Sequence, residues 1–243
     1  YLETEKTKDN SENNIKLNIM LRLKLKENTL KTERYFVFGM NSDVVNKRIK
    51  ELKENPKLAE KIDQLGVHFH RKSQNMSEWN LIYEISNSID EHILKLINVI
   101  CIGGGLPSEY ANTNVDVIES IFKKIAEFRD WLKKAQVKLM IEPGRFIAAP
   151  SIKLETTIIG MHENNIIVNA SVYNSDMDAL IVPVKLLIEG EFKKENIKDE
   201  KNKNENNTIK PYVIKGITPC SMDLFRYKVY LNNPKIGNKL TFL

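Results

Sequence analysis

The chain has 243 residues, 42% of them hydrophobic, which is typical of a globular protein and excludes a disordered or collagen-like chain. Its 37 basic and 32 acidic residues leave a formal net charge of +5, too mild to indicate a nucleic-acid partner. No apolar run approaches the roughly 18 residues that a membrane helix needs. We therefore expect neither nucleic acid nor a membrane as a partner.

The two cysteines, Cys101 and Cys220, are too few for a disulfide framework, so a reducing, cytoplasmic location is expected. The chain begins with Tyr1 in a polar segment and ends in an apolar run, Lys239 to Leu243. Both ends look cut, so we expect a fragment, and a targeting segment cannot be judged.

The first part of the chain alternates predicted strands and helices, which indicates βαβ units and a parallel sheet. Strands are predicted at 15–25, 35–38, 65–70, 99–102 and 137–141. The spacing of apolar residues predicts helices over 44–65, split at Pro56, and over 79–96 and 117–132.

After Pro150 the pattern changes to strands joined by short turns, with no helices between them. These strands are predicted at 154–159, 166–172, 180–188, 212–214 and 228–231. The fold class is therefore α/β plus all-β, with one domain over 1–150 and a β-domain over 151–243. Five lysines and five acidic residues at 191–207 predict a solvated insertion; a functional charge patch is the alternative.

Three of the α/β strands are followed by polar or glycine-rich sequence. These segments are His68 to Gln74, Gly103-Gly104-Gly105 and Glu142-Pro143-Gly144-Arg145. Ligand sites of parallel sheets and barrels form at the carboxyl ends of strands. The sequence therefore predicts that the three segments converge on one ligand.

Each segment also permits a second interpretation. His68 and His70 lie two apart on a strand and share a face, but no third metal ligand stands at convincing spacing. We expect no metal and favour an imidazole against a flat aromatic ligand, or a structural histidine.

The three glycines are either a flexible turn or a loop that binds phosphate through its backbone amides. The carboxylate of Glu142 suits a protonated ring nitrogen, and the guanidinium of Arg145 suits a phosphate. The alternative is a salt bridge between the two side chains.

Four motifs, in order, resemble one family over about residues 21–243. They are Gly66-Val67-His68-Phe69-His70 with Ser73-Gln74, Ile102 to Pro107, Glu142 to Arg145, and Gly216 to Asp223. The chain resembles the pyridoxal-phosphate (PLP) decarboxylases of ornithine, arginine, diaminopimelate and carboxynorspermidine. The resemblance implies a partial PLP-binding (β/α)8 barrel, similar to that of alanine racemase, followed by a C-terminal β-domain.

The resemblance also implies roles for single residues. His70 stacks on the PLP ring, and Glu142 pairs with its pyridinium nitrogen. The phosphate is held by Ser73, Gly103, Gly104, Gly105, Gly144 and Arg145. Members of the family work as homodimers, and the segment 216–223 reaches the partner's active site.

The chain departs from the family pattern in two places. The lysine that bears PLP in the family lies on an early barrel strand, before the segments recognised here. Pro219 and Cys220 stand where relatives carry a cysteine and an acidic residue, so the catalytic cysteine is absent or shifted by one place. We expect Cys220 to be catalytic and, with Asp223, to contact the substrate.

The predicted function is PLP-dependent decarboxylation of a basic amino acid, with ornithine or arginine ahead of diaminopimelate. It would belong to polyamine or lysine biosynthesis. One alternative is a catalytically inactive homologue that binds and regulates a partner protein. Another is a truncated chain without a stable fold of its own, because an incomplete barrel exposes open edges.

Overall fold

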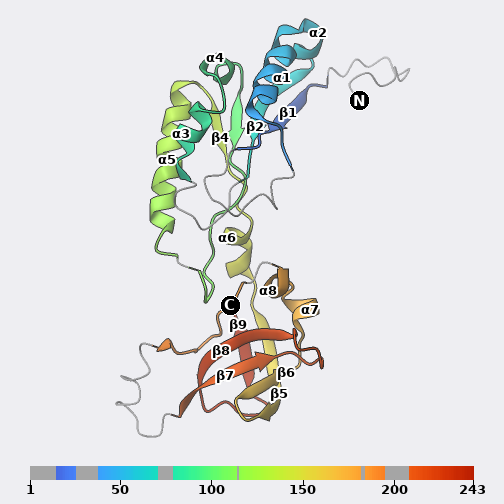
Figure 1. The fold of residues 1–243 in the computed structure, drawn as a ribbon, viewed down its shortest axis with the longest axis vertical. Coiled ribbons are helices and arrows are strands. Elements are labelled where there is room, and N and C mark those ends of the chain that lie inside the picture. The colour runs from blue at the N-terminus through green and yellow to red at the C-terminus, as the bar shows by residue number, and fades with distance from the viewer. Residues whose placement is uncertain (1–14, 26–37, 71–78, 114, 182–183, 195–207) are drawn as a thin grey trace, which may run out of the picture. The chain divides into compact units, whose positions relative to one another are not determined.

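The computed structural model describes residues 15–25, 38–70, 79–113, 115–181, 184–194 and 208–243. The chain separates into two compact units. The first consists of Tyr1–Gly105 and Val117–Pro143, and the second of Leu106–Asp116 and Gly144–Leu243. Both units appear in Figure 1, and each is described by itself.

The first unit is a four-stranded parallel sheet with the strand order β1-β2-β3-β4. Its strands are β1 (Leu17–Arg22), β2 (Ile62–His68), β3 (Val99–Cys101) and β4 (Lys138–Met140). Helices connect them in sequence: α1 (Ser42–Glu54), α2 (Pro56–Ala59), α3 (Leu81–Ser86), α4 (Glu91–Leu94) and α5 (Ile118–Lys134). Parallel strands in sequential order with intervening helices form part of a (β/α) barrel.

The strand register places the carboxyl ends of β2, β3 and β4 side by side. His68 pairs with Cys101, and Cys101 pairs with Met140. Gly66 permits the close approach of β2 to β3, because a Cβ on it would lie 2.5 Å from the carbonyl oxygen of Val99. The residues that follow these three strands therefore meet at one edge of the sheet.

Helix α5 covers the sheet with an apolar stripe of Ile121, Phe128 and Leu132, all buried. This stripe has the period expected of an amphipathic helix, and α5 packs on α3 and β4 (Figure 1). Buried residues of β2 and β3, such as Leu65, Val67 and Ile100, complete the core.

Two helix predictions in this unit are partly wrong. The predicted helix over 44–65 ends earlier, since Ile62 and Leu65 belong to β2. Their spacing fits a helix and a buried strand equally well, and periodicity alone does not separate the two. The predicted helix over 79–96 is two helices, because Asn87 ends α3 by donating its side-chain amide to the carbonyl of Tyr83 (2.8 Å). The predicted strand at 35–38 lies outside the described residues, except for Phe38 in a bend.

In the longer segment of the second unit, α6 (Arg145–Ala148) and a 3₁₀ helix (Ala149–Ser151) are followed by a five-stranded sheet. The sheet has the order β8-β7-β6-β5-β9, in which only the β6–β7 pair is parallel. Its strands are β5 (Leu154–His162), β6 (Asn165–Val168), β7 (Ile209–Lys215), β8 (Leu224–Asn232) and β9 (Lys239–Phe242). Its core includes Ile158, Ile166, Ile214, Phe225 and Phe242.

The β-domain prediction is confirmed, but it missed two short helices. Helices α7 (Val172–Ser175) and α8 (Asp178–Ile181) follow β6, so the predicted strand over 180–188 is wrong. The Ser171 hydroxyl starts α7 by accepting from the Tyr173 amide (3.2 Å), which is a helix-capping contact. Among the described residues, no helix is both long enough and apolar enough to span a membrane.

Candidate active site

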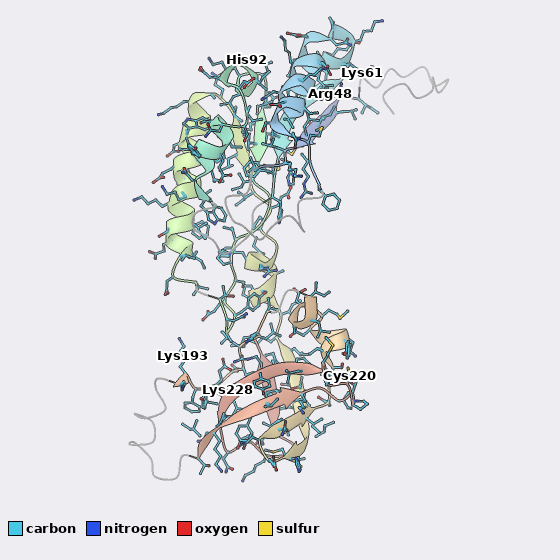
Figure 2. The ribbon with its side chains drawn as sticks, in the orientation of Figure 1. Arg48, Lys61, His92, Lys193, Cys220 and Lys228 are labelled. Atoms are coloured by element: carbon cyan, nitrogen blue, oxygen red, sulfur yellow. The ribbon has the colours of Figure 1, made fainter. Side chains whose placement is uncertain are left out.

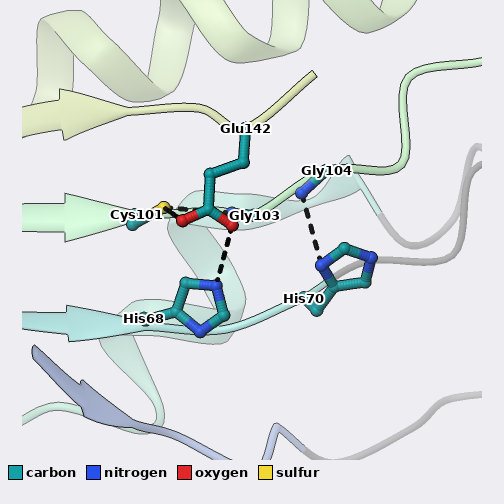
Figure 3. Close-up of polar contacts among 6 residues, drawn as sticks. All are labelled: His68, His70, Cys101, Gly103, Gly104 and Glu142. Carbon is teal, nitrogen blue, oxygen red and sulfur yellow. Dashed lines mark hydrogen bonds and ion pairs between the residues drawn. The ribbon is translucent and has the colours of Figure 1, made fainter. Parts of the chain in front are cut away.

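The first unit gathers His68, His70, Gly104 and Glu142 around the ends of β2, β3 and β4 (Figure 3). The Glu142 amide donates to the carbonyl of Gly103 (2.8 Å), so the pairing of β3 with β4 continues into this edge. The convergence that the sequence predicted is therefore present for these segments.

The carboxylate of Glu142 contacts a different side chain through each oxygen. Oε2 lies 3.3 Å from Nε2 of His68, and Oε1 accepts a hydrogen bond of 3.3 Å from the thiol of Cys101. The Cys101 hydrogen bond, followed by the contacts with His68 and the charge of His70, outweighs burial and lowers the pKa of Glu142. Glu142 is therefore ionised at neutral pH, and about half of its side chain remains exposed to a ligand.

Cys101 lies beneath this carboxylate and is completely buried. Burial raises the pKa of its thiol to about 11, so the sulfur keeps its proton at neutral pH. The Gly103 amide donates to Sγ (3.4 Å), while the S–H group donates to Glu142. Cys101 is thus a neutral hydrogen-bond donor and not a nucleophile.

His70 lies past the end of β2 and accepts a hydrogen bond from the Gly104 amide at Nδ1 (3.3 Å). Burial, the positive charge of Arg22 and the nearby His68 lower the pKa of His70. The ring is therefore neutral at pH 7, and its proton resides on Nε2 because Nδ1 is the acceptor. A neutral imidazole at this position suits a flat aromatic ligand.

Only glycine fits at two positions of the turn after β3. Gly103 has a φ of +67°, and a Cβ there would lie 2.6 Å from the Phe69 carbonyl oxygen and 2.7 Å from Nδ1 of His70. A Cβ on Gly104 would lie 2.8 Å from the carbonyl oxygen of Glu142. The absence of a Cβ at Gly103 and Gly104 therefore allows the turn to pack closely against both His70 and the backbone of Glu142.

The donor atoms of His68, His70 and Glu142 all lie within 4.8 Å of one another. The sequence indicated no third group near the two histidines, but the fold supplies Glu142. Two imidazoles and a carboxylate also occur in metal sites. The chemistry of PLP fits the same set of groups.

Beyond the turn after β3, the other predicted site residues lie outside the described residues or in the second unit. Ser73 lies outside the described residues. Gly144 and Arg145 begin the second unit, where the guanidinium of Arg145 lies 6.0 Å from the ring centroid of Tyr110. Cys220 and Asp223 also belong to the second unit, on the turn between β7 and β8.

Cys220 is exposed on this turn (Figure 2). It lies beside Tyr173 of α7. The Tyr173 hydroxyl and the Cys220 sulfur are 2.9 Å apart. This contact lowers the pKa of the Cys220 thiol and raises that of Tyr173, as expected if the hydroxyl donates to a thiolate. The Cys220 thiol is therefore exposed with a lowered pKa, whereas the Cys101 thiol is buried with a raised pKa.

Asp223 is buried, with 2% of its surface exposed. Its Oδ1 accepts from the Val172 amide (2.9 Å), and Oδ2 accepts from the amide and hydroxyl of Thr218 (3.0 and 2.7 Å). Burial alone would raise its pKa, but the hydrogen bonds from Thr218, Val172 and Ser171 together lower it. Asp223 ties the Cys220 turn to the start of α7.

The sequence interpretation missed the contacts of His68 and Cys101 with Glu142. From the sequence, His68 is a possible metal ligand beside His70 and part of the first motif, and Cys101 is one of two cysteines and part of a predicted strand. A usable signal was present, because Cys101 precedes the glycine run by one residue and His68 shares a face with His70.

The donor set of this cluster fits PLP. An ionised carboxylate suits a protonated pyridine nitrogen, a neutral imidazole suits the face of the ring, and a glycine turn permits close approach of a ligand. The fold is part of a (β/α) barrel, and the chemistry of this cluster suits a pyridoxal-binding domain.

The family of this chain follows from a comparison of its sequence with known families. Residues 2–149 match the family described as "Pyridoxal-dependent decarboxylase, pyridoxal binding domain". This match covers more than half of the chain, so the chain belongs to the pyridoxal-dependent decarboxylases, and its cofactor is PLP. No curated protein matches the sequence.

Solved structures of decarboxylases share the fold. The lysine decarboxylase of Selenomonas ruminantium matches with a TM-score of 0.68 and 19% identity, over 94% of this chain and 57% of that one. The lysine/ornithine decarboxylase of Vibrio vulnificus complexed with cadaverine gives 0.67 and 19%, over 93% and 57%. The carboxynorspermidine decarboxylase of Campylobacter jejuni complexed with norspermidine gives 0.64 and 18%, over 93% and 57%. The chain thus spans a little over half the length of these proteins.

Proposed function

We propose that this chain is part of a PLP-dependent enzyme that decarboxylates a basic amino acid, with ornithine or arginine ahead of diaminopimelate. The observation that carries the proposal is the half-exposed, ionised carboxylate of Glu142 beside the neutral ring of His70. The solved structures support the substrate class, since they include decarboxylases of lysine, ornithine, arginine and carboxynorspermidine.

When bound, PLP supplies the electron sink for loss of the α-carboxylate, which is chemistry that amino-acid side chains cannot provide. Glu142 would keep a proton on the pyridine nitrogen through its negative charge. His70 would present its ring to one face of the cofactor, held in place by the Gly104 amide. Gly103, Gly104 and Gly105 would receive the phosphate. The family resemblance also assigns Ser73, Gly144 and Arg145 to the phosphate, and that assignment stays a prediction.

The second unit offers a group that can move a proton at the substrate's Cα. Cys220 is exposed, and its contact with the Tyr173 hydroxyl lowers the pKa of the thiol, so the sulfur is suited to exchanging a proton. Asp223 would act on the substrate only through the turn that it holds, because its carboxylate oxygens are occupied within the chain. We propose a homodimer, in which segment 216–223 serves the partner's site.

A second candidate is a PLP-binding homologue without decarboxylase activity that regulates a partner protein. The pair Pro219-Cys220, at positions where relatives carry cysteine and an acidic residue, favours it. Both candidates predict binding of PLP, so turnover is what separates them.

The experiment is a CO2-release assay of the complete protein that contains this chain, with PLP and single amino acids: ornithine, arginine, lysine and diaminopimelate. The proposal predicts turnover of at least one of them, and a large loss of turnover in Glu142→Ala with the fold retained. The matched control is His92→Ala, an exposed histidine on α4 (Figure 2). Binding of PLP without turnover of any basic amino acid would favour the regulatory homologue.

A further inference from the structure

We infer that Cys101 is a positioning residue for Glu142, holding its carboxylate by one oxygen while His68 holds the other. This inference rests on the proposed function, because Glu142 is the group that would face the pyridine nitrogen. It assigns a part in the site to a buried cysteine that does not touch the ligand.

The geometry limits what Cys101 can do. Its side chain ends β3, is fully buried, and its sulfur lies 3.3 Å from Oε1 of Glu142. The Gly103 amide donates to the same sulfur (3.4 Å), which fixes the direction in which the S–H group points. With one neighbour donating to the sulfur and one accepting from it, the thiol has a single useful orientation.

The two hydrogen bonds on Glu142 come from neighbouring strands. His68 ends β2 and Cys101 ends β3, and these residues are register partners in the parallel pair. Each contacts a different oxygen of a carboxylate that follows β4, so three strand ends define the plane of one carboxyl group. A carboxylate that is half exposed would otherwise rotate freely in water.

The identity of the donor also matters. A carboxylic acid or an amine at position 101 would place a second charge or titrating group against Glu142. The thiol stays neutral at working pH because burial holds its pKa at about 11. It therefore supplies a hydrogen bond to the carboxylate without competing for the proton that the pyridine nitrogen must keep.

The test compares Cys101→Ala with Cys101→Ser, which keeps a donor of similar size. The first readout is the midpoint of the Glu142 carboxyl titration, followed by carbon-13 NMR in the protein without PLP. We expect the midpoint to move to higher pH in Cys101→Ala and to stay near the wild-type value in Cys101→Ser. The control is Val99→Ala, a buried truncation two residues earlier on β3, which should leave the midpoint unchanged.

The second readout is the dissociation constant of PLP. Loss of one typical hydrogen bond predicts binding about three- to tenfold weaker in Cys101→Ala, with recovery in Cys101→Ser. A Glu142 midpoint that is the same in wild type and Cys101→Ala would overturn the inference. Because the NMR titration needs no cofactor, a shifted midpoint in a protein that fails to bind PLP would instead reject the proposed function alone.

Discussion

The backbone amide of Gly104 donates a hydrogen bond of 3.3 Å to Nδ1 of His70, joining the turn after β3 to the segment after β2. This contact exists because neither Gly103 nor Gly104 carries a Cβ. It fixes the tautomer of the imidazole and the position of the ring next to Glu142. The glycine run therefore positions a side chain of the site, in addition to leaving room for a phosphate.

Substitution of Gly103 by alanine should disturb this arrangement. The new Cβ would lie 2.6 Å from a carbonyl oxygen at a φ of +67°, so collision and backbone strain add together. We expect the free energy of unfolding to fall by about 2 kcal/mol or more, measured by urea denaturation. Gly160→Ala is the control, since its Cβ would make ordinary contact at 3.5 Å with Ile167. Equal stability of the two variants would contradict this reading of the turn.

Asp223 should be a stabilising residue of the second unit. Asp223→Asn replaces one carboxylate oxygen by an NH2 group, which then faces the amide of either Val172 or Thr218, so we expect a loss of about 2–4 kcal/mol in urea denaturation. Met222→Ala, at an exposed neighbour, is the control and should change stability little.

The effect of Asp223 should depend on pH. Its pKa in the folded state is lower than in the unfolded chain, so its contribution is present above the unfolded value and is lost as pH falls through the folded one. The stability difference between wild type and Asp223→Asn should therefore shrink in acid. A difference that stays constant down to the acid transition would show that the carboxylate charge is not what the turn requires.

The two cysteines should differ in reactivity. Cys220 is exposed and its thiol pKa is lowered by the Tyr173 hydroxyl, whereas Cys101 is buried with a thiol pKa of about 11. Iodoacetamide at pH 7.5 should therefore label Cys220 and spare Cys101 in the folded protein, as measured by peptide mass spectrometry. Tyr173→Phe should slow the labelling of Cys220, and Tyr83→Phe is the control at an exposed tyrosine elsewhere. Labelling of both cysteines at equal rates would contradict this assignment.

Asp176 should make the second unit less stable as pH rises. It is buried, and Oδ2 has no hydrogen-bond partner within the described part of the chain. Burial, with a smaller contribution from Asp178, raises its pKa to about 6 from an ordinary value of 3.8. Because the folded-state pKa is the higher one, the stabilising contribution is complete below the unfolded value and disappears as pH rises through about 6.

Asp176→Asn should therefore be more stable than wild type at pH 7.5, by about 1–3 kcal/mol, and lose this advantage near pH 4. Urea denaturation at a series of pH values measures this difference in the free energy of unfolding. Asp178→Asn, at an exposed carboxylate, should show a much smaller difference. A stability gain for Asp176→Asn that does not vary with pH would argue against the titration of this group.

The sequence predicted the elements and motifs that depend on local pattern. The strand ends at His68, Gly103 and Glu142 could be found because parallel strands place their carboxyl ends together. The contacts of Cys101 and His68 with Glu142 could not, because they depend on the register that pairs His68 with Cys101. Gly66 permits this register, because a Cβ there would lie 2.5 Å from the carbonyl oxygen of Val99, and no local pattern reveals that contact.

Tertiary contacts explain the remaining differences between the sequence predictions and the structure. Asp223 stands in a motif that resembles a substrate-binding segment, and its sequence position gives no sign that its oxygens are occupied by Thr218 and Val172. Ile62 and Leu65 follow a helical spacing, yet they enter a strand because the chain must return to the sheet after α2. In both cases tertiary contacts decide the outcome.

The most direct test of the central claim is a titration of the protein with PLP, followed by absorbance, for wild type, Glu142→Ala and His92→Ala. If the cluster at the ends of β2, β3 and β4 binds the cofactor through Glu142, wild type and His92→Ala will bind alike. Glu142→Ala will then bind about tenfold more weakly or worse, with an altered absorption spectrum. Equal dissociation constants and spectra for all three proteins would contradict the account.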